Sequence, residues 1–111
     1  MEIDVKNISG IGAYETRVEN EGSEENKKER TLYIVGEKVF LVVRNNTIEV
    51  RCDDKLSKVL REKYESVMES RYFGRGGIEI VTSGQLSLEE LEDLIRLSYN
   101  LSAGITEYLS C

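Results

Sequence analysis

The stretch YFGRGGIEIV, which begins at Tyr72, places three glycines and an arginine directly before an apolar run. A phosphate cradle of the P-loop type needs the spacing G-x-x-x-x-G-K-S/T between a strand and a helix whose N-terminus faces the phosphate. Here the glycines are too closely spaced, and the surrounding pattern predicts a helix before them and a strand after them. We interpret Gly74, Gly76 and Gly77 as a turn that uses positive φ. An anion-binding nest around Arg75 remains the alternative.

Other residues able to do chemistry are few. The sequence has no histidine, which excludes Ser–His and Cys–His nucleophilic pairs and removes the commonest transition-metal ligand. Cys52 falls on the inward face of a predicted strand, where a buried structural thiol is expected, and Cys111 is terminal. Asp53 and Asp54 could bind a metal, but they stand where a helix N-cap belongs. We therefore expect no catalytic residue, no metal, no cofactor and no enzyme activity.

Three strands in quick succession form the centre of the predicted structure. TLYIVG (31–36) meets KVFLVV (38–43) through Gly36–Glu37, and TIEVRC (47–52) follows Asn45–Asn46, whose tolerance of positive φ favours a tight hairpin. The middle segment is apolar on both faces and should be central in the sheet. TIEVRC alternates between apolar and polar residues, as a half-buried strand does.

Two amphipathic helices are predicted after these strands. DDKLSKVLREKYESVM (53–68) has an aspartate to cap its first turn, and SLEELEDLIRLSYNLSAG (87–104) begins with a Ser87/Glu90 capping box and ends at Gly104. Each helix has a stripe of residues expected to be buried, which are Leu56, Val59, Leu60, Val67 and Met68 in the first and Leu88, Leu91, Leu94, Ile95, Ser98 and Leu101 in the second. Between the helices, IEIVT (78–82) is predicted as a short strand. This order indicates the α+β class. We expect one two-layer α/β domain over residues 1–111, with an antiparallel sheet and both helices packed on one face.

The N-terminal part of the chain is less regular. AYETRV (13–18) alternates weakly and is interpreted as either an edge strand or a poor helix. Residues 20–29 are charged and contain no apolar side chain whose burial could offset the entropy of ordering, so a mobile loop is expected there. Residues 1–30 are accordingly predicted to be weakly structured.

The faces of the central strands suggest an interaction surface. If Ile48 and Val50 face the helices, alternate residues of the two preceding strands should face them too, namely Leu32, Ile34, Phe40 and Val42. The remaining apolar side chains would form a strip on the other face, bordered by Glu49 and Arg51. Such a strip is typical of an interface, unless the N-terminal segment folds over it. The side chains expected in the strip are Tyr33, Val35, Leu41 and Val43.

The charge distribution bears on nucleic-acid binding and location. The 111 residues carry a net charge of −6, which opposes non-specific contact with phosphate backbones. Residues 51–75 contain seven basic and five acidic side chains, a net charge of +2. Tyr72, Arg75, Arg71 and Lys58 are therefore a candidate anion or nucleic-acid patch, disfavoured by the overall charge. Neither a signal peptide nor a membrane-spanning run is evident, so we expect a cytoplasmic protein without membrane contact.

From Gly36 onward the sequence resembles the MmcQ/YjbR-like family of small bacterial proteins. The matching stretches are GEKVFLVV (36–43), TIEVRCDDKL (47–56), the region of Tyr72, and SLEELEDLIRLSYNL (87–101). Ser98, Tyr99 and Leu101 match the Ser-Tyr-x-Leu ending of the family's last helix. The chain departs from the family's Tyr-x-Met-Asn-Lys-x-x-Trp stretch, where Tyr72 alone is clearly retained. The TfoX N-terminal domain is a related possibility.

The resemblance implies an architecture similar to the secretion-chaperone-like folds, and it carries no catalytic residues. The family is often labelled DNA-binding. We expect a non-enzymatic binding or protein-interaction module whose partner is a second copy of the chain or another protein. A DNA-binding protein is the alternative, and an enzyme that works without histidine is a third, less favoured one.

Overall fold

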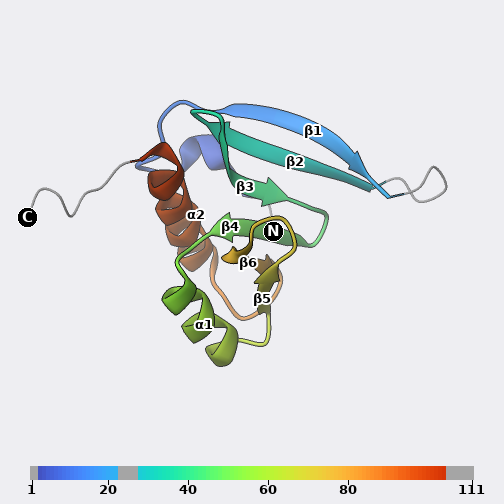
Figure 1. Cartoon of the computed structure of the whole chain (residues 1–111), viewed down its shortest axis with the longest axis vertical. Coiled ribbons are helices and arrows are strands. Elements are labelled where there is room, and N and C mark those ends of the chain that lie inside the picture. Colours follow the sequence, from blue (N-terminus) through green and yellow to red (C-terminus); the bar gives the residue numbers. More distant parts are fainter. Residues whose placement is uncertain (1–2, 23–27, 105–111) are drawn as a thin grey trace, which may run out of the picture.

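The computed structural model describes residues 3–22 and 28–104 of the chain (Figure 1). Its elements are η1, a 3-10 helix (Val5–Asn7), β1 (Glu15–Glu21), β2 (Lys28–Val35), β3 (Lys38–Val43), β4 (Thr47–Arg51), α1 (Asp54–Lys63), β5 (Val67–Ser70), β6 (Gly74–Val81) and α2 (Leu88–Ala103). The strands form one six-stranded antiparallel sheet in the order β1-β2-β3-β4-β6-β5. Both helices pack on the same face, so the predicted two-layer α+β fold is confirmed.

The predicted meander of three strands is present as β2, β3 and β4. Gly36 and Glu37 have φ angles of 53° and 73°, the backbone of a tight hairpin turn that matches the twist of the strands. The β3–β4 hairpin closes with the Arg44 N–H donating to the Thr47 carbonyl at 2.8 Å. The positive φ expected at Asn45–Asn46 is not found, because Glu37 is the only non-glycine residue of the described ranges with positive φ.

A β-bulge at Phe40 decides which side chains face the helices. Tyr33 pairs with Leu41 while Ile34 pairs with Val39, so Phe40 is an extra residue in β3. Phe40 and Leu41 therefore both project into the helix-side core, although they are neighbours in a strand. On the opposite face, a second small cluster is formed by Leu32, Ile34 and Val42.

The predicted assignment of faces is therefore wrong for β2 and, apart from Phe40, for β3. The four side chains of the expected interface strip pack against the helix-side core, where Leu41 is fully buried and Tyr33, Val35 and Val43 are half-buried. When both faces of a strand are apolar, polarity cannot fix the phase of the alternation, and the extra residue at Phe40 interrupts it.

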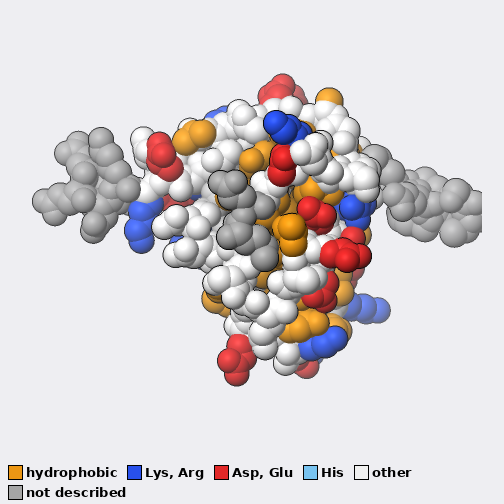
Figure 2. All heavy atoms as spheres, turned by 180° about the vertical axis from the view of Figure 1, so that it is seen from behind, with side chains coloured by type: hydrophobic (Ala, Val, Ile, Leu, Met, Phe, Trp, Pro, Cys, Tyr) orange, Lys and Arg blue, Asp and Glu red, His pale blue; other side chains and the backbone are white. Residues whose placement is uncertain are grey.

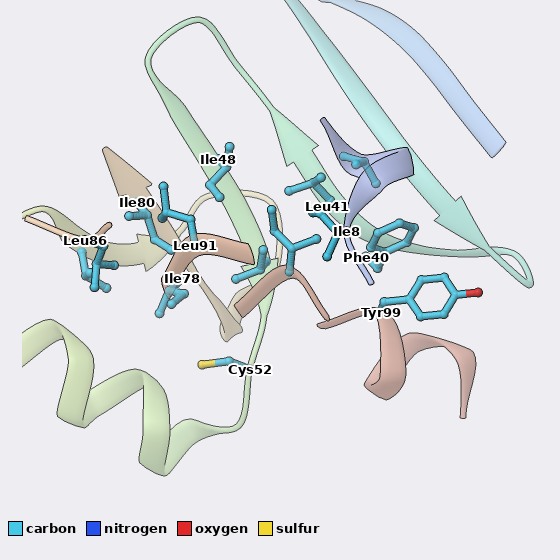
Figure 3. Close-up of a cluster of buried hydrophobic side chains, with 14 residues drawn as sticks. Ile8, Phe40, Leu41, Ile48, Cys52, Ile78, Ile80, Leu86, Leu91 and Tyr99 are labelled. Carbon is cyan, nitrogen blue, oxygen red and sulfur yellow. The ribbon is translucent and has the colours of Figure 1, made fainter. Parts of the chain in front are cut away.

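The N-terminal segment folds over part of this surface, which was the alternative to an exposed interface strip. Val5 of η1 and Ile8 are buried members of the same core. Tyr14 packs on Tyr33 with the ring centroids 5.5 Å apart. In Figure 3, Ile8 lies beside Leu41. These contacts bury side chains that would otherwise be left in water.

The helix termini follow their local sequence signals. The Asp53 carboxylate accepts a hydrogen bond from the Leu56 N–H at 2.8 Å, so the predicted cap at the start of α1 is confirmed. Ser87 and Glu90 form both hydrogen bonds of the predicted capping box. Gly104 ends α2 in the left-handed conformation, with φ 74°.

Helix α1 is shorter than predicted, and a strand takes the place of its last turns. The helix ends at Lys63, and Val67, expected on its buried stripe, pairs with Ile80 as part of β5. Val59, another member of that stripe, is 58% exposed. The prediction is wrong here because the free edge of β6 offers hydrogen bonds and a buried position to Val67, a tertiary gain that helical spacing does not report.

The first two strands form a long hairpin (Figure 1). They pair without a register shift from Glu15 with Ile34 to Glu21 with Lys28, so 13–18 contributes an edge strand and not a helix. Residues 20–21 and 28–29, expected in a mobile loop, are paired strand. The remainder of that loop, 23–27, lies outside the described residues, as does Cys111. In the described ranges, the part predicted to be weakly structured contains η1, β1 and the start of β2.

Candidate functional site

The sheet face opposite the helices, called the open face below, carries a ladder of alternating charges. The Arg30 guanidinium on β2 binds Glu19 at 2.8 Å and Glu21 at 3.0 Å on β1. The Arg44 guanidinium binds Glu21 from the other side at 2.7 Å. The hydrogen bond from Arg44 lowers the pKa of Glu21 below its ordinary value, against the opposing effect of burial. Glu21, a charged residue of the expected loop 20–29, is therefore held by ion pairs in place of an apolar anchor.

Glu49 is a buried carboxylate at the centre of the open face. It is paired with Arg44, and one oxygen accepts hydrogen bonds from Ser70 Oγ at 2.6 Å and from the Tyr72 N–H at 2.8 Å. Ser70 Oγ in turn accepts from the Phe73 N–H at 2.8 Å. Glu49 therefore anchors the connection between β5 and β6 to the middle of the sheet.

Glu79 lies directly across from Glu49 on β6, and the two like charges are neutralised separately. The Glu79 carboxylate accepts from Arg71 at 2.9 and 2.7 Å and from Thr47 Oγ1 at 2.8 Å. Burial alone would raise the pKa of Glu79, but the hydrogen bonds from Arg71 and Thr47 outweigh it and lower the pKa.

Two aromatic rings and two arginines form a stack on the same face. Tyr72 and Phe73 lie nearly parallel, with centroids 5.0 Å apart and an interplanar angle of 23°. The Arg30 guanidinium lies 5.1 Å from the Tyr72 ring centre and the Arg51 guanidinium 4.8 Å from that of Phe73. The Arg51 Nε also donates to the Val39 carbonyl at 2.7 Å. The stack packs against Leu32, Ile34 and Val42.

Of the three glycines predicted to form a turn with positive φ, only Gly74 has it, with φ 62° where the chain passes from β5 into β6. Gly76 and Gly77 lie within strand β6, and the stretch follows a strand and not a helix. A Cβ on Gly77 would come within 2.5 Å of the Val50 carbonyl oxygen, so this position admits only glycine where β6 meets β4. The sequence contains no helix start at this place, and the Arg75 side chain is exposed.

The residues of the predicted basic patch do not all come together. Arg71 and Tyr72 lie on the open face, where Arg71 is paired with Glu79. Lys58 lies on α1, in the helical layer on the other side of the sheet. Arg51, predicted to border the strip of Tyr33, Val35, Leu41 and Val43, is on the opposite face from it.

Sequence reasoning missed the buried carboxylates and their arginines. Glu49 and Glu79 each interrupt an apolar strand, and a charged residue in that position needs a partner when the strand is central. That signal was present in TIEVRC and IEIVT. Arg30 and Arg44 carried no comparable signal, because their partners are set by the pairing of β1 with β2.

The Ser98–Tyr99 pair of α2 fixes the helix to the sheet at the bulge. Ser98 Oγ donates to the Phe40 carbonyl at 2.5 Å and accepts from the Arg51 N–H at 2.8 Å. The Tyr99 hydroxyl donates to the Ala13 carbonyl at 3.1 Å, and its ring packs edge-on against Phe40 (Figure 3). Ser98 and Tyr99 of the Ser-Tyr-x-Leu pattern therefore hold the backbone of Phe40, Arg51 and Ala13 in place. The third residue of the pattern, Leu101, is 48% exposed.

A groove of about 710 Å³ opens beside the aromatic stack, at the start of β1. Ile34 and Val39 contribute apolar surface to it, Tyr72 joins them from the β5–β6 connection, and Glu15 and Arg17 of β1 line it with charge. The Arg17 side chain is exposed and makes no ion pair or hydrogen bond with any residue in the described ranges. Figure 2 shows acidic and basic side chains mixed with hydrophobic ones on the face it presents.

Strand β1 forms one edge of the sheet and pairs on one side only. Five of its seven residues are exposed and the other two are half-buried. A strand edge leaves every second N–H and C=O without a partner in the sheet, which is the arrangement that accepts an added strand. The edge and the groove share Glu15 and Arg17.

The side chains that could take part in a reaction are buried or are used in hydrogen bonds within the fold. Cys52 is buried, and this burial raises the pKa of its thiol to about 11, so it stays protonated near neutral pH. Glu49, Glu79 and Ser98 use their oxygens in the contacts given above. Within the described ranges, no cluster of three or more acidic or cysteine side chains could hold a metal ion.

None of the helices in residues 3–22 and 28–104 is long and apolar enough to cross a membrane. Comparison with curated proteins and with solved structures gave no significant match. The family model described as YjbR matches residues 16–101 of the 111-residue chain, which spans the sheet from β1 and both helices. The expectation drawn from GEKVFLVV, TIEVRCDDKL and the Ser-Tyr-x-Leu helix is confirmed, and the chain belongs to the MmcQ/YjbR family.

Proposed function

We propose that this chain is a non-enzymatic protein-interaction module that binds an extended segment of another polypeptide along the edge of β1. The observation that carries the proposal is the unpaired outer edge of Glu15–Glu21, which runs beside the groove lined by Ile34, Val39 and Tyr72. An added strand would gain main-chain hydrogen bonds from the edge, while its side chains would meet the groove.

The state of the reactive side chains supports a binding role over catalysis. A general acid or base needs a titratable group that is free to reach a substrate. Here Glu49 is fully buried and holds the β5–β6 connection, and Glu79 is held by Arg71 and Thr47. The thiol of Cys52 is buried as well.

Nucleic-acid binding has less support. Its predicted patch is divided between the two layers, because Lys58 lies on α1 while Tyr72 packs on the open face. Arg71 is already neutralised by Glu79. The net charge of −6 opposes the counterion release that drives non-specific DNA affinity.

Charges on β1 restrict which segments it accepts. Every second residue of β1 is charged, namely Glu15, Arg17, Glu19 and Glu21. Charged edges of this kind discourage indiscriminate pairing. Glu19 and Glu21 are occupied by Arg30, whereas Arg17 has no partner in the described ranges. A bound segment should therefore place an acidic side chain opposite Arg17.

The test is selection of short random peptides displayed on phage against the purified full-length chain, followed by nuclear magnetic resonance titration of a selected peptide. We expect the amide signals of Glu15–Glu21 to shift most, and selected peptides to alternate with an acid at one fixed position. Peptides that shift the signals of α1 or of the Arg71–Arg75 region instead would overturn the proposal.

Two adjacent proline variants provide matched controls. Successive N–H groups of a strand point to opposite edges, so of Arg17→Pro and Val18→Pro one removes an N–H bonded to β2 and the other an outward N–H. The variant that retains the wild-type melting temperature most closely should be the one with the outward N–H, and it should not bind the peptide. Full binding by both folded variants would contradict strand addition.

A further inference from the structure

We infer that one polypeptide that pairs with β1 is a second copy of this chain, arranged so that the two-fold axis passes Val18 and the two sheets become continuous. This inference rests on the proposed function of β1 as a strand acceptor. Both edges then have the same sequence, so the register alone determines which residues face each other.

Geometry restricts the registers of such a pair. In an antiparallel pair the outward-pointing groups of one strand must meet those of the other, so the axis passes a residue and not the space between two. An axis at Val18 lets all seven residues of β1 overlap, from Glu15 opposite Glu21 of the second copy to the reverse. Side chains on the open face then stay together on one side.

Charge complementarity favours the same register. With the axis at Val18, each Arg17 stands opposite Glu19 of the second copy, which gives two cross-strand ion pairs. The Arg17 guanidinium, which has no partner in the described ranges, thereby gains the Glu19 carboxylate of the second copy, while one oxygen of Glu19 stays bound to Arg30. The like-charged pair at each end, Glu15 with Glu21, is moderated because Glu21 already binds Arg30 and Arg44.

Neighbouring registers are worse. An axis at Arg17 sets Arg17 against itself and Glu15 against Glu19. An axis at Glu19 pairs Arg17 with Glu21, but it sets Glu19 against itself and only residues 17–21 of the two strands overlap. An axis at Thr16 pairs Glu15 with Arg17, but only residues 15–17 of the two strands then overlap. Val18 therefore gives the longest overlap together with two opposite-charge pairs.

The exposed apolar side chain of the strand lies at the axis. Val18 is 61% exposed, the highest value among the large hydrophobic residues in the described ranges. It projects to the helix side, since it pairs with Thr31 next to Tyr33. On the axis, the two Val18 side chains would contact each other and leave water. Because two such strands bury less than the roughly 1,600 Å² of a standard interface, the dimer should be weak and concentration dependent.

The experiment is analytical ultracentrifugation of the full-length chain and of two charge reversals, Arg17→Glu and Glu19→Arg. The wild type should show an average mass that rises from monomer towards dimer with concentration. Each variant alone sets like charges at both central pairs and should stay monomeric. An equimolar mixture of the two variants restores opposite charges at both pairs and should dimerise, as should the double variant. Lys58→Glu, the same reversal on α1, should behave as the wild type.

Several results would overturn the inference. A wild type that stays monomeric up to about 1 mM, the upper end of weak affinities, excludes self-pairing. Dimers of the single variants as strong as those of the wild type exclude this register, as does a mixture that remains monomeric although circular dichroism shows both variants folded. If the wild type is monomeric while selected peptides still shift the β1 signals, self-pairing fails and the proposed function stands. Peptides that bind elsewhere remove the proposed function itself.

Discussion

Ser98 forms hydrogen bonds with backbone groups of two strands, the Phe40 carbonyl of β3 and the Arg51 N–H of β4. Its hydroxyl thereby joins α2 to the sheet. From the sequence, Ser98 was recognisable as part of a buried helical stripe and of a family pattern, but its hydrogen bonds were not. The bulge at Phe40, whose carbonyl accepts one of them, depends on how β2 pairs with β3.

Replacing Ser98 with alanine should destabilise the fold by about 2 kcal/mol, because a buried carbonyl and a buried N–H lose their partner. Urea unfolding followed by circular dichroism measures the change. Ser102→Ala is the matched control on the same helix. The Ser102 hydroxyl is also buried but makes no hydrogen bond with the described residues, so this variant should be nearly neutral. Equal costs for the two variants would contradict the assigned role of Ser98.

Glu79 makes part of the stability depend on acidity. Its pKa in the folded protein lies below the ordinary value of 4.5, so the folded state binds fewer protons than the unfolded state near that pH. Its contribution is therefore complete above 4.5 and is lost as the pH falls through the lowered folded pKa. Glu79→Gln should be less stable than the wild type at neutral pH and should lose less stability on acidification.

The measurement for Glu79 is the free energy of unfolding at neutral pH and at a series of acidic values. Glu89→Gln, in the exposed first turn of α2, is the control and should follow the wild type. An acid dependence of Glu79→Gln identical to that of the wild type would show that the Arg71 and Thr47 contacts do not set the titration of Glu79.

Some features of the secondary structure are determined by adjacent residues, and others are not. The β2–β3 turn, the caps of α1 and α2 and the left-handed Gly104 depend on a few adjacent residues, and they could be predicted from the sequence. Strand β5 and the outer half of the β1–β2 hairpin could not. Val67 of β5 pairs with Ile80 on β6, a tertiary gain that helical spacing does not report, and in the hairpin the stabilising groups are charges such as Arg30 and not apolar side chains.

Gly77 provides a test of the close contact between β6 and β4. Alanine there would drive its Cβ against the Val50 carbonyl and the Phe73 ring, at 2.5 and 2.9 Å, and should cost about 2 kcal/mol, typical of overpacking. Thermal unfolding gives the comparison. Gly76→Ala is the neighbouring control, since its nearest contact is at 3.5 Å. If the two variants melt together, the approach of the strands is looser than described.

At the scale of the whole molecule, the proposed binding element is an edge of the sheet and not one of its faces. Helices cover one sheet face, and the turn with Tyr72 and Phe73 occupies part of the other. The interaction surface predicted from the sequence lies in the core, because sheet faces in β2 and β3 could not be told apart by polarity. An edge strand was one of the two interpretations of AYETRV (13–18), but its extension to Glu21 and the groove beside it could not be read from the sequence.

The proposed function depends on whether the outer edge of β1 accepts an added strand. The decisive measurement is amide hydrogen exchange of the full-length chain, followed residue by residue with and without a selected peptide. We expect alternate amides of Glu15–Glu21 to exchange quickly in the free protein, because those N–H groups have no partner in the sheet, and to become protected when the peptide binds. Protection that appears only elsewhere in the chain, or fast exchange at β1 that is unchanged by the peptide, would rule out strand addition at β1.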